Sequence, residues 1–199
     1  MSKSIRIAIT GQIGTGKSFV SNVLKSWGHA VYESDKEVKA LYNNAIFVKK
    51  ILREFKNSIE NIEKKNGEID KEKLSLHVFD NEKDLRRLEK IVHPILQNKQ
   101  IKFIKKHKGN DKLFFDIPLL FQKKLHRNFD FIIYTTVSKK IQKDRVMNRP
   151  EMTRGLFKKI LLAQSIEKKL IDEFVSLIID TSCDEKKIKS KLKGFLEQH

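Results

Sequence analysis

The sequence predicts an α/β fold in which a parallel sheet is flanked by helices and interrupted by a helical insertion. Three observations predict it. A short apolar run, Ile5–Ile9, leads directly into a glycine-rich stretch and then into a helical pattern. Helical periodicity dominates from about residue 36 to 107, where strand patterns are hard to find. Strand patterns return after residue 110 and alternate with helical ones, as in a parallel sheet.

The first elements form the opening unit of the sheet. Ile5–Ile9 is the first predicted strand, and a helix is predicted from Lys17 to about Ser26. Ala30–Tyr32 is the second predicted strand. This succession of strand, glycine-rich loop, helix and strand is the βαβ unit of a parallel sheet.

The middle of the chain contains two predicted helices with identifiable caps. Asp70 is a predicted N-cap for a helix with apolar positions Leu74, Val78 and Phe79. Asn81 is the predicted cap of a longer helix, whose apolar positions are Leu85, Leu88, Ile91, Val92, Ile95 and Leu96. Pro94 should kink or restart this second helix, and the polar stretch 57–67 is predicted to form a loop.

The last third of the chain returns to alternating strands and helices. Strands are predicted at Leu113–Phe115, Phe131–Tyr134 and Val175–Ile179, with helices near 138–147, 154–172 and 184–197. A chain of 199 residues suits one α/β domain with an insertion. We therefore predict a split core of about residues 1–35 and 110–199, and a helical insertion of about residues 36–109.

The chain is strongly basic, with 42 Lys and Arg against 25 Asp and Glu and a formal net charge of +17. A basic field attracts polyanions, so one interpretation is nucleic-acid binding. The other is that the lysines are spread over solvated helix faces. The sequence favours the second interpretation, because no block of lysines is long enough for a nucleic-acid-binding tail.

Cysteine content and the N-terminal hydropathy indicate a compartment. Cys183 is the single cysteine, so no intrachain disulfide can form, and a reducing compartment is expected. The apolar run Ile5–Ile9 is too short for the apolar core of a signal peptide and for a bilayer span. The sequence therefore predicts a cytoplasmic protein with no membrane partner.

A phosphate-binding motif follows the first strand. Its residues satisfy G-x-x-x-x-G-K-[ST] at every fixed position: Gly11, Gln12, Ile13, Gly14, Thr15, Gly16, Lys17 and Ser18. Backbone N–H groups of such a loop form an anion nest, and the next helix directs its N-terminal dipole at the same charge. Lys17 should reach the β- and γ-phosphates of ATP, and the Ser18 hydroxyl should bind Mg²⁺. A P-loop between a strand and a helix predicts a P-loop NTPase-type sheet.

A segment with two arginines, later in the chain, indicates which class of P-loop protein this is. Arg145 and Arg149 lie just past the strand predicted at 131–134, where small-molecule kinases carry a mobile lid. We predict a lid at about residues 146–165, with both arginines neutralising charge on the transferred group. The alternative is ordinary helix-surface charge. The chain also lacks the Asn-Lys-x-Asp guanine signature.

Five segments carry a resemblance to a known family. They are Thr10–Gly14, Val31–Asp35, Leu88–Ile95, Asp116–Phe121, and Arg145–Arg149 followed by Ile160–Gln164. In this order, along nearly the whole chain, they resemble the motifs of the dephospho-CoA kinase family. Leu88–Ile95 and Asp116–Phe121 matter most, because a generic P-loop fold requires neither.

The resemblance implies an activity and a substrate. Family members transfer phosphate from ATP to the ribose 3′-hydroxyl of dephospho-CoA, the last step of coenzyme A synthesis. They have a P-loop core, an inserted helical domain that binds CoA, and a lid, which implies that the insertion of this chain is its substrate domain. The expected cofactors are ATP and Mg²⁺, and the expected partner is dephospho-CoA. A monomer or weak homo-oligomer is expected, with no specific nucleic acid.

Two carboxylates are candidates for the chemistry. Asp35 follows the second strand and is the candidate base for the acceptor hydroxyl; the alternative is an N-cap for a helix starting near Lys36. Asp116 ends the strand Leu113–Phe115, in a Walker B-like position suited to Mg²⁺; the alternative is a solvated carboxylate. His93 is assigned no chemistry. His77, Arg86 and Arg87 are expected at the surface or in packing.

The chain departs from the family pattern at several positions. These are Gln12 for a glycine, Glu33 for an aspartate, Gln122 for an acid, Lys159 for an arginine, Thr181 for an asparagine and Cys183 for a glycine. Thr181 remains a predicted nucleotide-binding residue, although threonine offers one hydroxyl where asparagine donates and accepts at once. The departures affect the adenine side and the lid, and leave the P-loop, Asp35 and Asp116 unchanged.

Three alternative functions stay open at this point. The first is another nucleoside or nucleotide kinase of the same fold, which the acceptor would distinguish. The second is a nucleic-acid-binding P-loop ATPase, which would show hydrolysis stimulated by RNA or DNA; the chain contains no helicase-like second motif or RNA-binding module. The third is a family member that binds nucleotide without chemistry.

Overall fold

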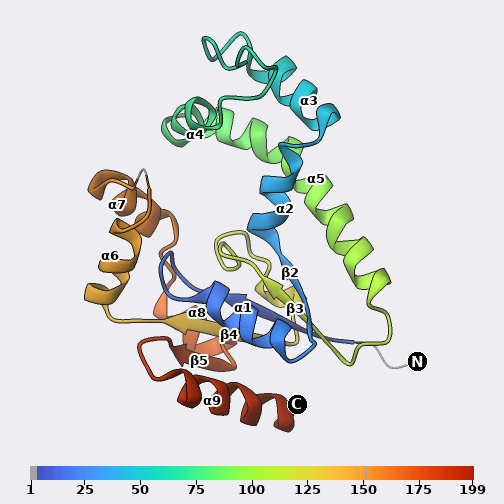
Figure 1. The fold of residues 1–199 in the computed structure, drawn as a ribbon, viewed down its shortest axis with the longest axis vertical. Helices are drawn as coiled ribbons and strands as arrows, with labels where there is room; N and C mark the ends of the chain where they lie inside the picture. Colours follow the sequence, from blue (N-terminus) through green and yellow to red (C-terminus); the bar gives the residue numbers. More distant parts are fainter. Residues whose placement is uncertain (1–3, 151) are drawn as a thin grey trace. The chain divides into compact units, whose positions relative to one another are not determined.

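The structure is a computed structural model that describes residues 4–150 and 152–199. The chain divides into two compact units (Figure 1). One comprises the chain up to Glu33 together with His107–His199, and the other is Ser34–Lys106. Residue 151, inside the predicted lid, and residues 1–3, inside the predicted core, lie outside the described residues.

A five-stranded parallel sheet forms the centre of the first unit. Its strands are β1 (Ile5–Thr10), β2 (Ala30–Glu33), β3 (Lys112–Asp116), β4 (Phe131–Thr136) and β5 (Leu177–Asp180). The order across the sheet is β2-β3-β1-β4-β5, so β3 lies between the first two strands of the chain. The predicted α/β class with a parallel sheet is confirmed.

The helices of this unit are α1 (Lys17–Ser26), α6 (Lys139–Met147), α7 (Arg154–Ala163), α8 (Lys168–Phe174) and α9 (Glu185–Gln198), with a short 3₁₀ helix at His126–Asn128. The single helix predicted over 154–172 is wrong, because α7 ends at Ala163 and α8 begins at Lys168. Gln164 and Ser165 instead make hydrogen bonds to residues remote in sequence. These tertiary contacts replace continuation of the helix.

The core of the sheet unit lies between the strands and two helices. Its buried cluster includes Ile7, Ile9, Phe114, Ile133 and Ile179 from the sheet, Val20, Val23 and Leu24 from α1, and Ile188, Leu192 and Phe195 from α9. Helices α1 and α9 are therefore held on the sheet by burial of apolar side chains. Such burial contributes a free energy of about 25 cal/mol per Å² of apolar surface removed from water. This packing fixes the N-terminus of α1, where the phosphate-binding loop enters it.

The second unit is helical, with α2 (Ser34–Leu41), α3 (Ala45–Phe55), α4 (Lys71–Asp80) and α5 (Glu82–Lys106). Asp70 accepts from the N–H of Lys73 at 3.1 Å, and Asn81 accepts from the N–H of Asp84 at 3.2 Å, so both predicted caps are confirmed. The unit has its own apolar core, made by Leu41, Phe47, Ile51, Phe55, Ile59, Ile62, Ile69, Leu74, Val78 and Ile91.

Pro94 does not restart α5, which runs continuously from Glu82 to Lys106. A proline removes one N–H donor and crowds the preceding turn. Ile91, Val92, Ile95 and Leu96, on both sides of the proline, pack in or against the core of the unit. This packing stabilises the helix across the proline, so of the two predicted outcomes, a kink or a restart, the restart does not occur.

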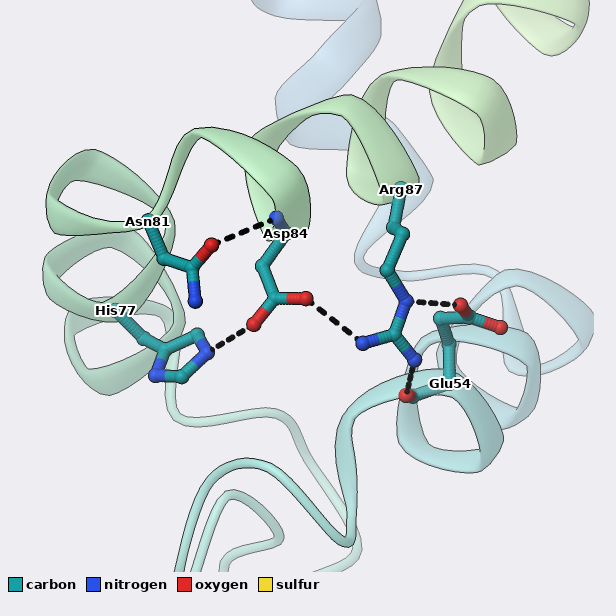
Figure 2. A network of polar contacts seen from close by, with 5 residues as sticks. All are labelled: Glu54, His77, Asn81, Asp84 and Arg87. Carbon is teal, nitrogen blue, oxygen red and sulfur yellow. Dashed lines mark hydrogen bonds and ion pairs between the residues drawn. The ribbon is translucent and has the colours of Figure 1, made fainter.

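A polar network joins three helices of the second unit (Figure 2). The carboxylate of Asp84, which is 8% exposed, lies 2.6 Å from His77 Nε2 of α4 and accepts from Arg87 Nη1 at 2.7 Å. Arg87 also donates to Glu54 Oε1 at 2.6 Å and to the Glu54 carbonyl at 2.8 Å, at the end of α3. His77 and Arg87 are thus packing residues, while Arg86 is exposed and pairs with Glu82.

Replacing Asp84 with asparagine is expected to lower the free energy of unfolding of the helical unit by about 2 kcal/mol, because the buried Asp84 carboxylate, the charged acceptor for His77 and Arg87, becomes a neutral amide. Hydrogen bonds from His77 and Arg87 hold the pKa of Asp84 below its ordinary value. A lowered pKa stabilises the fold above the unfolded carboxyl pKa, and this contribution is lost as the pH falls through the folded value. The difference between wild type and Asp84→Asn should therefore shrink below about pH 4.

Hydrogen exchange of amides in Ser34–Lys106 during a urea titration would measure this effect. Glu82→Gln is the matched control. Glu82 also lies in the first turn of α5 and pairs with an arginine, but its side chain is 78% exposed, so little change is expected. Equal effects of the two substitutions would contradict a stabilising role for the buried Asp84 carboxylate and its partners.

Candidate active site

The parallel strands bring several polar residues to one edge of the sheet. In the register of the sheet, Asp116 of β3 lies opposite Ile9 of β1 and opposite Glu33 of β2. The loop Gly11–Gly16 leaves the same end of β1, and Thr181 follows the end of β5. Ligands of α/β sheets bind at the carboxyl ends of the strands, so this edge is the expected place for a site.

All three glycines of the loop have backbone geometry that other residues rarely adopt: φ is 147° at Gly11, 78° at Gly14 and 88° at Gly16. A Cβ atom on Gly14 would lie 2.6 Å from Val146, and one on Gly16 would lie 2.7 Å from Thr181. Both contacts are too short for real atoms, so the loop approaches α6 and the end of β5 only because these positions are glycine.

The carbonyl groups of the loop are held by side chains around it. Lys17 Nζ donates to the carbonyls of Gly11 at 2.8 Å and Gln12 at 3.1 Å. Gln142 Nε2 of α6 donates to the Ile13 carbonyl at 2.8 Å. The Thr181 hydroxyl donates to the Thr15 carbonyl at 2.9 Å.

A planar trans peptide places its N–H opposite its C=O. The carbonyls of Ile13 and Thr15, which accept from Gln142 and Thr181, therefore leave the N–H groups of Gly14 and Gly16 directed away from those side chains. The N–H groups of Lys17 and Ser18, the first two residues of α1, have no acceptor within the helix. Together these groups form the donor set of an anion nest at a helix N-terminus.

A cavity of about 490 Å³ lies against this loop. The predicted site residues that line it are Gly14, Gly16, Lys17, Ser18, Arg145, Arg149 and Thr181. Its lining also includes four residues that sequence reasoning missed: Phe19, Cys183, Glu185 and Ile188. Phe19 follows the motif directly, and the other three lie at the start of α9 or just before it. Only their nearness to the motif and to Thr181 could have suggested them.

Arg145 is bound to the end of β5. Its Nη1 donates to the Thr181 hydroxyl at 2.8 Å, and its Nη2 donates to the Thr181 carbonyl at 2.9 Å. The nearby Asp180 carboxyl accepts from the hydroxyl and N–H of Ser182, and these bonds, with a smaller effect of Arg145, lower its pKa. Thr181 therefore links the P-loop, α6 and the last strand through one hydroxyl that both donates and accepts.

Asp116 is buried at the end of β3, where its Oδ2 accepts from the Ser21 hydroxyl of α1 at 3.1 Å. Ser21 lies one helical turn after Ser18, so this bond places the carboxylate beside the first turns of α1. An alcohol at Ser18 and a carboxylate at Asp116 are hard oxygen donors, which suit Mg²⁺. The two oxygen donors have the chemistry that suits Mg²⁺ bound with nucleotide phosphates, and of the two only Ser18 lines the cavity.

The remaining candidate residues lie on helices of the second unit. Asp35 is exposed in the first turn of α2, which begins at Ser34. The alternative that Asp35 caps a helix starting near Lys36 is therefore wrong, whereas Asp35 does follow the second strand, two residues after β2 ends at Glu33. His93 is exposed on α5.

The family model and the similar proteins that have been compared with this chain agree with one another. The sequence model of a family described as dephospho-CoA kinase matches residues 5–183. A dephospho-CoA kinase of Bartonella quintana is 34% identical over 180 residues, which cover 89% of each chain. A dephospho-CoA kinase structure from Campylobacter jejuni aligns with a TM-score of 0.64 and 25% identity, over 99% of this chain and 98% of that one. The crystal structure of TT1252 from Thermus thermophilus aligns with a TM-score of 0.84, 25% identity and the same coverage.

Proposed function

Because this chain belongs to the dephospho-CoA kinase family, we propose that the cavity beside its P-loop holds ATP for phosphoryl transfer to the ribose 3′-hydroxyl of dephospho-CoA. The products are coenzyme A and ADP. One observation carries the proposal for the site: a P-loop with outward-bonded carbonyls borders a cavity that is also lined by Arg145 and Arg149. Backbone N–H groups and arginines are the donors that phosphoryl transfer needs.

Each residue of the site has a proposed role in phosphoryl transfer. Lys17 leaves the carbonyls that it bonds and pairs with the β- and γ-phosphates. Arg145 and Arg149, which line the cavity, neutralise charge on the transferred group. Thr181 holds Arg145 and the P-loop in place from the nucleotide side. Ser18 and Asp116 would hold Mg²⁺, which would neutralise phosphate charge.

Asp35 is the proposed acceptor-side carboxylate. It accepts or orients the proton of the attacking hydroxyl, a step that requires little deprotonation early in a loose transition state. The helical unit Ser34–Lys106, which carries Asp35 and the Leu88–Ile95 motif, is the proposed substrate domain. Residues of about 146–165 form the proposed lid.

The proposal also includes the setting of the enzyme. No helix in the described part of the chain is long and apolar enough to cross a membrane. We infer a cytoplasmic enzyme, as a monomer or weak homo-oligomer, whose partners are small molecules. The basic charge is assigned to solvated helix faces rather than to a nucleic-acid surface.

The test is phosphate transfer from labelled ATP, with Mg²⁺, to a panel of acceptors. Dephospho-CoA should be phosphorylated, whereas nucleosides and nucleoside monophosphates should not. Transfer to a nucleoside with no transfer to dephospho-CoA would assign the site to another kinase activity. ATP hydrolysis that RNA or DNA stimulates at physiological salt would favour a nucleic-acid-dependent ATPase.

A further inference from the structure

The turn between α7 and α8 is bonded to the tip of the P-loop. The Ile13 N–H donates to Gln164 Oε1 at 2.6 Å. Gln12 Nε2 donates to the Gln164 carbonyl at 3.4 Å, a longer and weaker contact. The partners are about 150 residues apart in sequence. The turn between α7 and α8 therefore packs directly against the P-loop through tertiary contacts.

A second contact fixes the same turn from another side. Gln122, in the segment after β3, donates from Nε2 to the Ser165 carbonyl at 2.9 Å. The other amide atom, Oε1, is buried and has no hydrogen-bond partner among the described residues. Only a donor suits the position that faces Ser165, because a carboxylate there would place an oxygen against the carbonyl oxygen.

These contacts determine how the peptides around Ile13 are directed. The Ile13 N–H is held by Gln164, and the Ile13 carbonyl is held by Gln142 of α6. The Ile13 carbonyl and the Gly14 N–H belong to one planar peptide and point in opposite directions. Holding the carbonyl on α6 therefore directs the Gly14 N–H away from α6, and Gly14 lines the nucleotide cavity.

We propose that Gln122 is a positioning residue: by bonding Ser165, it holds Gln164 on the Ile13 N–H and keeps the tip of the P-loop in its phosphate-binding form. Gln12 strengthens the same contact from within the loop. Gln122 acts through Gln164 and is not among the residues that line the cavity. The link to nucleotide affinity rests on the proposed function of the cavity, whereas the link between Gln122 and the Ile13 amide does not.

The test compares Gln122→Met, which has a similar length and no donor, with Gln164→Met and the double variant. In the nucleotide-free protein, hydrogen exchange of the Ile13 amide should be about tenfold faster in Gln122→Met, the effect of losing one good hydrogen bond. Exchange of β1 amides should not change. The double variant should exchange Ile13 no faster than Gln164→Met alone, because the two residues act in series.

Nucleotide binding gives the functional readout. Gln122→Met should weaken ADP binding and raise the KM for ATP by about three- to tenfold, because a smaller fraction of the loop is binding-competent. The kcat at saturating ATP should stay within about twofold, since bound phosphates order the loop themselves. Gln198→Met is the control, because Gln198 is an exposed glutamine at the end of α9.

Unchanged Ile13 exchange in Gln122→Met would overturn the proposal. So would equal acceleration of Ile13 and β1 exchange, because Gln122 would then act on stability alone. Additive effects in the double variant would show that Gln122 does not act through Gln164. If Ile13 exchange responds as expected but the wild-type protein does not phosphorylate dephospho-CoA, the positioning role stands and the proposed function fails.

Discussion

Replacing Lys17 with alanine is expected to lower kcat by at least about 10²-fold. The Lys17 side chain lines the cavity and donates hydrogen bonds to the carbonyls of Gly11 and Gln12. Its charge becomes more valuable as negative charge shifts between the β- and γ-phosphates in the transition state. Alanine removes that charge, and it also removes the donor that holds two loop carbonyls.

Steady-state transfer to dephospho-CoA would measure this effect, with Lys193→Ala as the control. Lys193 is exposed on α9, where its 3.9 Å pair with Glu197 is expected to contribute little. Lys17→Arg separates the two roles of the side chain, because it keeps the charge but changes the shape. Near-normal turnover of Lys17→Ala would show that the motif does not bind the reacting phosphates.

Replacing Asp35 with asparagine is expected to lower kcat by about 10²–10⁴-fold, with near-normal affinity for ATP. Asparagine keeps the size and hydrogen-bonding capacity of the side chain but cannot accept the proton. Asp35 lies in the first turn of α2, where loss of a negative charge also weakens the interaction with the helix dipole. Glu72→Gln controls for this, because Glu72 is an exposed acid in the first turn of α4.

A Mg²⁺ titration distinguishes Asp35 from Asp116. Asp116→Asn should raise the Mg²⁺ concentration needed for half-maximal rate and recover partly at high metal, because one anionic ligand is lost. The bond from the Ser21 hydroxyl can persist on the amide oxygen, so the fold should be retained. Rescue of Asp35→Asn by Mg²⁺, without rescue of Asp116→Asn, would show that the two roles are exchanged. Normal turnover of both variants would remove both residues from the mechanism.

Local patterns predicted most of the elements and the phosphate-binding loop. Ile5–Ile9 lies in β1, and the helix predicted from Lys17 to Ser26 is α1. These predictions succeed because a buried strand, a glycine-rich turn and a helix start each depend on neighbours within a few residues. The caps Asp70 and Asn81 were predicted for the same reason, since a cap bonds an N–H only three residues away.

Contacts between segments that are remote in the chain could not be predicted from the sequence. The break of the predicted helix after Ala163 accompanies the bonds of Gln164 and Ser165 to Ile13 and Gln122. The continuity of α5 through Pro94 accompanies packing that outweighs a local preference. Neither result follows from propensity, because burial and pairing with distant residues decide them.

The sequence by itself determined the α/β class, the P-loop and the family, because these depend on residue types at fixed spacings along the chain. Only the tertiary structure decided that Thr181 joins Arg145 to the P-loop and that Ser21 bonds Asp116. It also decided that Phe19, Cys183, Glu185 and Ile188 line the cavity. The physical reason is the parallel sheet, which brings the ends of strands more than 100 residues apart in sequence to one edge, where their side chains meet.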